Sequence, residues 1–231
     1  MSLRAMLLAA GRGARMRPLT DTTPKPLLMV QGKPLIEWHI ERLAAAHIQE
    51  VVINHAWLGE QIEAYLGDGS RWGVNIHYSA ENPALETAAG IKKALPLLGS
   101  APFLVISADI WTDWNPQMAH YLAQSLAPAN ASAHLVLVPN PEHNPQGDFA
   151  FANGYVHAKS AHTNYTYSGL GVFHPAFFDQ VSAHTPTPLR EPLQHALAHQ
   201  QVLGSIYQGS WMDIGTPERL KQIEQNLASK A

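Results

Sequence analysis

The chain of 231 residues contains no cysteine and no long apolar run. Without cysteine there are no disulfides, no thiolate metal sites and no cysteine nucleophile. The N-terminal apolar run AMLLAA is broken by Gly11 and Arg12, which leaves it too short for a signal-peptide core or a membrane span. We therefore expect a soluble, cytoplasmic protein with no membrane partner.

A strong net charge is also lacking. Fifteen Lys and Arg residues stand against eighteen Asp and Glu residues, which gives a formal net charge of −3. With this net charge the protein has no overall positive potential that would attract nucleic acid, so we expect no nucleic-acid partner. Any cluster of basic residues must be local. The hydrophobic share of 46% is ordinary for a globular protein. The length suits one sizeable α/β domain with its own core.

Strand-like and helix-like apolar patterns alternate through the first half of the chain, which is typical of βαβ units and a mainly parallel sheet. The period-2 and continuous apolar runs predict strands at 4–10, 50–55, 74–79 and 103–109. The period-3.6 runs predict helices at 34–46, 58–66 and about 87–95.

The pattern loosens after this first part. Strand patterns with less helix between them follow at 133–139, 148–158 and 165–174. They indicate antiparallel additions to the sheet. We predict a single Rossmann-like α/β/α domain with a mixed, mostly parallel central sheet. Its expected parts are about 1–112, about 113–215 and a C-terminal helix over 217–230.

A glycine loop follows the first strand, in the stretch LAAGRGARMRPLTDTTPKP (8–26). It is not a P-loop, because one residue separates Gly11 from Gly13 and no Gly-Lys-Ser/Thr ending follows. A dinucleotide fingerprint is weak, because its third glycine position holds a methionine. Backbone N–H groups after such a turn can still hold phosphate, with Arg15 and Lys25 as cations. A tight surface turn with solvated basic residues explains the glycines alone equally well.

The full spacing is more specific than its two glycines. Gly-x-Gly-x-Arg-Met-x-Pro-Leu-Thr followed by Pro-Lys-Pro closely resembles the signature of the sugar-1-phosphate nucleotidyltransferases, and VQGKPLIEW (30–38) resembles that family's next segment. Weaker similarity continues to the C-terminus, in VVINHAWLGEQIE, LET, GDF and WMDIGTPERL. The resemblance implies a glycosyltransferase-A-like fold, in which the part over 1–112 binds the nucleotide and the part over 113–215 binds the sugar.

These segments are most similar to family members that transfer a uridylyl group from UTP to N-acetylmuramate 1-phosphate in peptidoglycan recycling. The resemblance implies catalytic roles for Arg15 and Lys25. It implies nucleotide binding by Ala10, Gly11, Arg12, Gly13, Lys25 and Thr87. It also implies substrate binding by Ser107 and Asp148, and a Mg²⁺ ion held by Asp109 and Asp213. A hard cation on one or two carboxylates plus substrate phosphates is the usual magnesium arrangement.

Several of these residues have plainer explanations. Asp109 ends a predicted strand and Asp148 follows a glycine, so both suit turn or cap positions. Thr87 suits a helix N-cap. Only His195 and His199 among thirteen histidines form an i, i+4 pair, and no HExxH is present, so we expect no histidine metal cluster.

Three residues depart from the family pattern. Ala89 stands where glycine is usual, and we expect its Cβ to press on a base that approaches the backbone. Ser107 and Ala108 replace an Asn-Gly pair, which shortens a polar contact and strains any positive-φ backbone there. Two alternatives therefore stay open. One is another sugar, glucose or mannose 1-phosphate with UTP, dTTP or GTP. The other is a nucleotide-sugar-binding protein without turnover. We expect a monomer or simple homo-oligomer.

Overall fold

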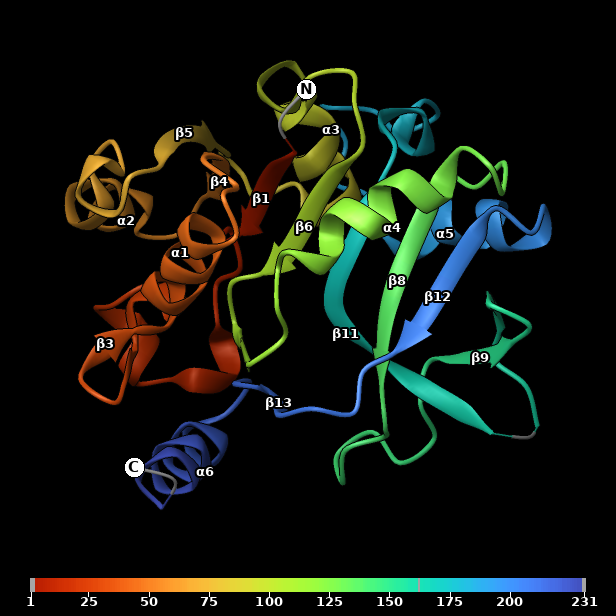
Figure 1. The fold of residues 1–231 in the computed structure, drawn as a ribbon. Helices are drawn as coiled ribbons and strands as arrows, with labels where there is room; N and C mark the ends of the chain where they lie inside the picture. Colours follow the sequence, from red (N-terminus) through yellow and green to blue (C-terminus); the bar gives the residue numbers. More distant parts are fainter. Residues whose placement is uncertain (1–2, 162, 230–231) are drawn as a thin grey trace.

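A nine-stranded sheet forms the centre of the computed structural model, which describes residues 3–161 and 163–229 (Figure 1). The strand order is β5-β4-β1-β6-β11-β8-β12-β10-β9. In that order the strands are Asn75–Ala80, Glu50–His55, Arg4–Leu8, Phe103–Ser107, Asn164–Phe173, Ala133–Val138, Val202–Ile206, Tyr155–Ala158 and Phe149–Ala152.

Helices cover both faces of this sheet, because the central strands are apolar on both sides. In β1, Ala5 and Leu7 pack into one core cluster and Met6 packs into the other. One face is covered by α1 (Leu35–Ala45), α2 (Gly59–Leu66) and α4 (Met118–Leu126), and the other by α3 (Glu86–Leu98) and α5 (Arg190–Ala198). The α/β/α layering predicted from the sequence is confirmed.

Parallel and antiparallel pairing divide the sheet. Strands β5, β4, β1 and β6 pair in parallel, as does β8 with β12, and the other pairings of the sheet are antiparallel. The sheet is therefore mixed, as predicted, but five of its nine pairings are antiparallel, so it is not mostly parallel; the parallel pairings are concentrated in the first half of the chain. Because β1 and β6 run side by side in parallel, their carboxyl ends meet at one edge of the sheet. Ligands of open α/β sheets bind at such an edge.

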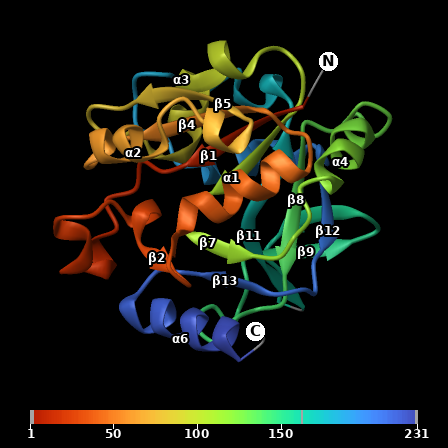
Figure 2. The same cartoon turned by 60° about the vertical axis from the view of Figure 1, so that its left-hand side comes forward.

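A smaller two-stranded ladder lies next to this edge. In it β7 (Ile110–Thr112) pairs antiparallel with β13 (Trp211–Asp213), and α6 (Pro217–Ala228) follows β13 (Figure 2). A second ladder joins β2 (Met29–Val30) to β3 (Lys33–Pro34). Short 3-10 helices complete the described chain: Ala14–Met16, Leu19–Asp21, Lys25–Leu27, Ser70–Trp72 and Pro175–Phe178. The predicted final helix forms, and residue 230 of its range lies outside the described residues.

The structure departs from the sequence prediction in three places. The predicted strand over 148–158 is a hairpin of β9 and β10, because Asn153 and Gly154 both have positive φ and form its turn. Helices α4 and α5 were missed; in α5 only Leu193 and Ala196 are buried, so its apolar stripe is short. The predicted strand over 103–109 ends at Ser107. None of the described helices is long and apolar enough to cross a membrane.

Candidate active site

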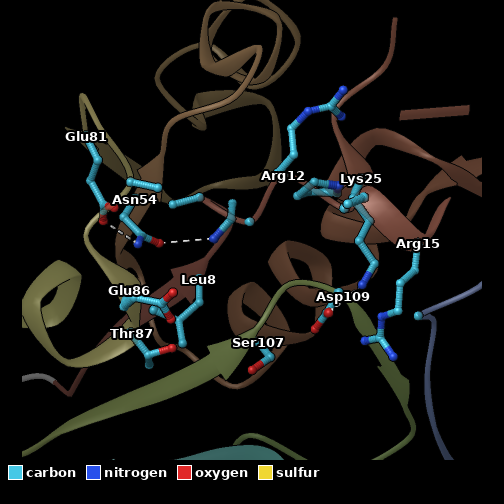
Figure 3. A pocket seen from close by; sticks show the side chains of 18 residues that line it. Leu8, Arg12, Arg15, Lys25, Asn54, Glu81, Glu86, Thr87, Ser107 and Asp109 are labelled. Carbon is cyan, nitrogen blue, oxygen red and sulfur yellow. Dashed lines mark hydrogen bonds and ion pairs between the residues drawn. The ribbon is translucent and has the colours of Figure 1, made fainter. Parts of the chain in front are cut away.

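The glycine loop lines a cavity of about 520 Å³ at the carboxyl edge of the parallel strands (Figure 3). Ala10 to Gly13 follow β1 and Ala9, and they line the cavity wall. Within residues 3–161 and 163–229, no acceptor bonds the amide N–H groups of these four residues. A row of unpaired backbone donors at a cavity wall is the arrangement that holds phosphate oxygens. The structure thus brings the predicted loop residues together in one cavity.

Gly13 allows the loop to fold back onto Lys25. Gly13 has a φ of +65°, and a Cβ there would lie 3.0 Å from Thr20 Cγ2 and 3.3 Å from Lys25 Cβ. The Thr20 hydroxyl donates a hydrogen bond of 2.8 Å to the Gly13 carbonyl. A side chain at position 13 would therefore be strained and would displace the lysine stem. The glycine and the lysine are parts of one packed turn, which explains their appearance together in the sequence.

Lys25 is buried and directs its ammonium at Asp109. Its side chain is 9% exposed, and Nζ lies 2.5 Å from Asp109 Oδ2. Asp109 lies two residues after β6, at the sheet edge, and its side chain is 41% exposed. The ion pair joins two groups that are 84 positions apart in the sequence. It places a cation and a carboxylate side by side on the cavity wall.

The side chains of the two loop arginines Arg12 and Arg15 point in different directions. Both line the cavity, and Figure 3 shows Arg15 extending beside Lys25 and Asp109 while Arg12 points away from them. The Arg12 guanidinium lies 3.8 Å from the Trp57 ring centroid and pairs with Asp21 at 2.9 Å. Among the described residues, Arg15 has no hydrogen-bond or ion-pair partner. Arg15 is therefore available to an anionic ligand, whereas the Arg12 side chain is tied to the rim.

Asp213 is brought close to Asp109 through the backbone. Asp213 pairs with Ile110 in the β13–β7 ladder, and the Ile214 N–H donates to the Asp109 carbonyl at 2.8 Å. The Asp213 carboxylate is 2.6 Å from Arg219 Nη1, and its Oδ1 is 2.8 Å from His143 Nε2. Asp213 does not line the cavity, although Gly215 does. The two predicted acids are neighbours, each held by a basic side chain.

Asn54 and Glu81 form the opposite wall, and the sequence analysis missed both. Asn54 Oδ1 accepts from the Ala9 N–H at 3.0 Å, and its Nδ2 donates to Glu81 Oε1 at 2.7 Å. Glu81 Oε2 accepts from the Leu85 N–H at 2.8 Å. Both side chains are buried and line the cavity. A signal was available, because Asn54 lies near the end of the parallel strand β4 and Glu81 directly follows the parallel strand β5.

This buried pair also explains a glycine in α3. A Cβ at Gly90 would lie 2.5 Å from Glu81 Oε1 and 3.0 Å from Asn54 Nδ2. Ala89, by contrast, is fully buried in the core and does not line the cavity. The expectation that the Ala89 Cβ presses on a bound base is therefore wrong. Gly90 is the small residue that the site needs, because it makes room for the carboxylate.

The corner before α3 presents Thr87 to the cavity. Helix α3 begins at Glu86, so Thr87 lies in its first turn and is not its N-cap. Glu86 has a φ of +63°, in the left-handed region, and lines the same cavity. A glutamate in this conformation costs about 1 kcal/mol or more. Ala108 does not have positive φ, so the expected strain at that residue is also wrong.

A second cavity of about 600 Å³ adjoins the first. Leu8, Thr87 and Ser107 line both, so the two form one continuous site. The Ser107 side chain packs against Gly169, where an added Cβ would lie 2.7 Å from the Ser107 hydroxyl oxygen. Asp148 lines the second cavity. Ser107 and Asp148, the two predicted substrate-binding residues, are thus brought together in one cavity wall.

Asp148 is held rigidly in this wall. Its Oδ2 accepts from the Tyr167 N–H at 2.9 Å and its Oδ1 accepts from Asn144 Nδ2 at 3.0 Å. Gly147 before it has a φ of +61°, and a Cβ there would lie 2.6 Å from Asn140 Oδ1. The plain turn explanation accounts for these hydrogen bonds but not for the position of the carboxylate in a cavity wall. Each oxygen keeps a lone pair for a ligand hydroxyl.

A buried histidine supports the strand behind Asp109. His39 Nε2 donates to the Ile110 carbonyl at 2.8 Å from within α1. Burial lowers the pKa of His39 to about 4, partly offset by that hydrogen bond. His39 is therefore neutral at pH 7 and holds the segment after Asp109. Among the described residues, no group of three or more His, Cys, Asp or Glu side chains is placed to hold a metal ion.

Comparisons with known proteins agree with this architecture. The model of the nucleotidyl transferase family matches residues 4–230. The chain is 52% identical to N-acetylmuramate alpha-1-phosphate uridylyltransferase of Neisseria meningitidis, over 96% of this chain and 97% of that protein. It is 34% identical to the protein of the same name from Caulobacter vibrioides, over 97% and 96%. A crystal structure of a putative glucose-1-phosphate thymidylyltransferase from Bacillus anthracis has the same fold, with a TM-score of 0.84 and 19% identity over 97% and 95% of the two chains.

Proposed function

The chain belongs to the nucleotidyl transferase family, and on that premise we propose that it transfers a uridylyl group from UTP to N-acetylmuramate 1-phosphate. The names of two relatives similar over nearly their whole length support this sugar and this base. The products are UDP-N-acetylmuramate and pyrophosphate, and the reaction suits the recycling of peptidoglycan.

One observation carries the proposal: the unpaired amides of Ala10 to Gly13, Arg15 and the Lys25–Asp109 pair line one cavity wall. In the reaction, an oxygen of the sugar phosphate attacks the α-phosphorus of UTP in line, and the bond to pyrophosphate breaks. Two anions must be held together, so neutralisation of charge is the main requirement. The continuous site lets the triphosphate occupy the first cavity while the sugar occupies the second.

The protein's own groups divide this work. Lys25 sits between the loop and Asp109, where its ammonium can pair with phosphate charge that develops in the transition state. Arg15 and the loop amides can hold the departing pyrophosphate with bidentate and backbone hydrogen bonds. Asn54 and Glu81 hold the first residue of the loop and the corner before Thr87 in fixed positions. No covalent nucleophile is required.

The two neighbouring acids fit a magnesium ion. Asp109 and Asp213 offer only carboxylate oxygens, the donors that Mg²⁺ prefers, and the β13–β7 ladder joins their backbones. When bound, the ion would neutralise phosphate charge. Lys25 and Arg219 balance the same carboxylates in the structure. We propose that Asp109 and Asp213 would hold a Mg²⁺ ion, which would supply positive charge to the substrate phosphates.

The test is pyrophosphate release by the purified protein with Mg²⁺. UTP, dTTP, GTP and ATP are each paired with the 1-phosphates of N-acetylmuramate, N-acetylglucosamine, glucose and mannose. We expect release with UTP and N-acetylmuramate 1-phosphate, lost in Asp109→Asn and kept in the exposed control Asp179→Asn. Release with another pair would keep the chemistry and replace the substrates. Tight binding of UDP-N-acetylmuramate without any release would favour a binding protein.

A further inference from the structure

The second cavity carries an excess of positive charge. Lys159 and Arg190 line it together with one acid, Asp148, whose two oxygens already accept hydrogen bonds. We propose that Arg190, assisted by Lys159, binds the carboxylate of an acidic substituent on the sugar, and so selects an acidic over a neutral sugar 1-phosphate. This inference rests on the proposed function, in which the substituent is the lactyl ether of N-acetylmuramate.

Arg190 differs from most cations around the site. Lys25, Arg12 and Arg219 each contact a carboxylate of the protein. Arg190 is exposed, and within the described part of the chain no hydrogen bond or ion pair engages its guanidinium. A guanidinium offers a planar fork of donors that matches a carboxylate, and it keeps its charge at every physiological pH. An arginine without a protein partner in a cavity wall is therefore suited to an anionic ligand.

The backbone fixes Arg190 relative to the first cavity. The Thr187 N–H donates to the Leu85 carbonyl at 3.0 Å, and the Ala88 N–H donates to the Thr187 carbonyl at 2.9 Å. These bonds tie the segment before α5 to the corner that presents Thr87. Arg190 begins α5, three residues after Thr187. These backbone hydrogen bonds thus fix the position of the Arg190 backbone relative to the wall that the two cavities share.

Lys159 comes from another wall of the same cavity. It follows β10, and Nζ donates to the Gly147 carbonyl at 3.0 Å and to Gln146 Oε1 at 3.3 Å. The ammonium therefore lies next to the turn that holds Asp148. Two cations from different segments can bind a substituent that projects from one side of the sugar ring, while Asp148 accepts from its hydroxyls. A neutral sugar gains nothing from either cation.

The experiment compares two sugars that differ only in the lactyl ether, N-acetylmuramate 1-phosphate and N-acetylglucosamine 1-phosphate. We expect Arg190→Gln to raise KM for the acidic sugar about 30-fold with kcat little changed, because one charged hydrogen-bonded pair is lost. KM for the neutral sugar should stay the same. Lys159→Gln should give a smaller rise of about 5-fold. Arg190→Lys should recover part of the loss, and Lys221→Gln on α6 is the matched control.

Calorimetric binding of both sugar phosphates separates the two proposals. If wild-type protein does not turn over the acidic sugar, the proposed function fails, while binding of that sugar that is lost in Arg190→Gln would still support the inference. Equal losses for both sugars would show that Arg190 contacts a shared feature. No change in either KM or in binding would overturn the inference, provided that the melting temperatures of the variants match wild type.

Discussion

The two cavities meet at Leu8, Thr87 and Ser107 but are built in different ways. The first lies at the ends of parallel strands, and a buried hydrogen-bond network fixes its walls. The second is assembled mainly from separate segments of the later part of the chain, and Arg190 in its wall, like Arg15 in the first cavity, is paired by no described residue. The difference suggests that the first cavity serves the reaction for any sugar, whereas the second decides which sugar is accepted.

The strongest test of this division is Lys25→Ala. We expect kcat to fall about 10² to 10³-fold, because a preorganised charge at the transferring phosphate is removed. The fall should be the same for every sugar that the protein accepts. Lys33→Ala is a matched control, since Lys33 forms a 2.5 Å pair with Glu41 outside the cavity. A fall in kcat that depends strongly on the sugar would contradict the idea that the first cavity serves the reaction for any sugar.

The rigidity of the first cavity depends on Asn54. Asn54→Ala leaves the buried Glu81 carboxylate without its amide donor and the Ala9 N–H without its side-chain acceptor. We expect the free energy of unfolding to fall by about 3 kcal/mol, together with weaker UTP binding. Urea unfolding and calorimetry measure the two effects. In the control Asn75→Ala, an equally short but exposed bond to Glu50 is lost, and a change below about 0.5 kcal/mol is expected.

Two buried histidines, His39 in α1 and His134 in β8, test how the stability of the fold depends on pH. Burial lowers the pKa of His39 and of His134 to about 4. In the unfolded chain both titrate near 6.5, so below that pH the unfolded state binds more protons and stability falls. As the pH falls from 7.5 to 5, each of the two histidines should lower the free energy of unfolding by about 2 kcal/mol. In urea unfolding, His134→Gln should remove the part of the pH dependence of the unfolding free energy that His134 contributes. An unchanged pH dependence would contradict the lowered pKa of His134.

The smallest expected effect concerns Glu86, at the corner where the first cavity approaches the second. Its φ of +63° is strained for glutamate. We expect Glu86→Gly to raise the free energy of unfolding by roughly 0.5 kcal/mol, because relief of strain exceeds the added entropy of the unfolded chain. Glu86→Ala keeps the strain and should not stabilise. If both variants stabilise equally in thermal unfolding, backbone strain is not the cause.

Comparison of the two regions also shows where sequence reasoning works. The first cavity depends on local order: a strand, a glycine turn and a lysine whose stem packs on Gly13. Such features lie within twenty residues of one another and could be predicted. The signal for Asn54 and Glu81 was present at the ends of two strands but carried no spacing motif. Their partners, Ala9 and Leu85, become evident only when β1, β4 and β5 pair.

The wall of the second cavity that α5 forms could not be predicted, although Ser107 and Asp148 in its other walls were expected from the family resemblance. The apolar stripe of α5 is too short to identify it as a helix, so the sequence pattern does not place Arg190 at the site. The expected harm from Ala89 and Ala108 was wrong for a related reason. Neither the face of α3 that meets the core nor the φ of a residue after a strand follows from residue type alone.

By itself the sequence determined the alternation of strands and helices and the glycine loop, since these depend on periodicity and on short spacings, whereas the two acids were implied only by the family resemblance. The tertiary structure alone decided which residues share a wall. It set Asp213 beside Asp109 through a two-stranded ladder, directed Arg12 away toward Trp57, and left Arg190 in the wall of the second cavity. Contacts between residues far apart in the chain depend on packing, and packing is decided by the whole fold.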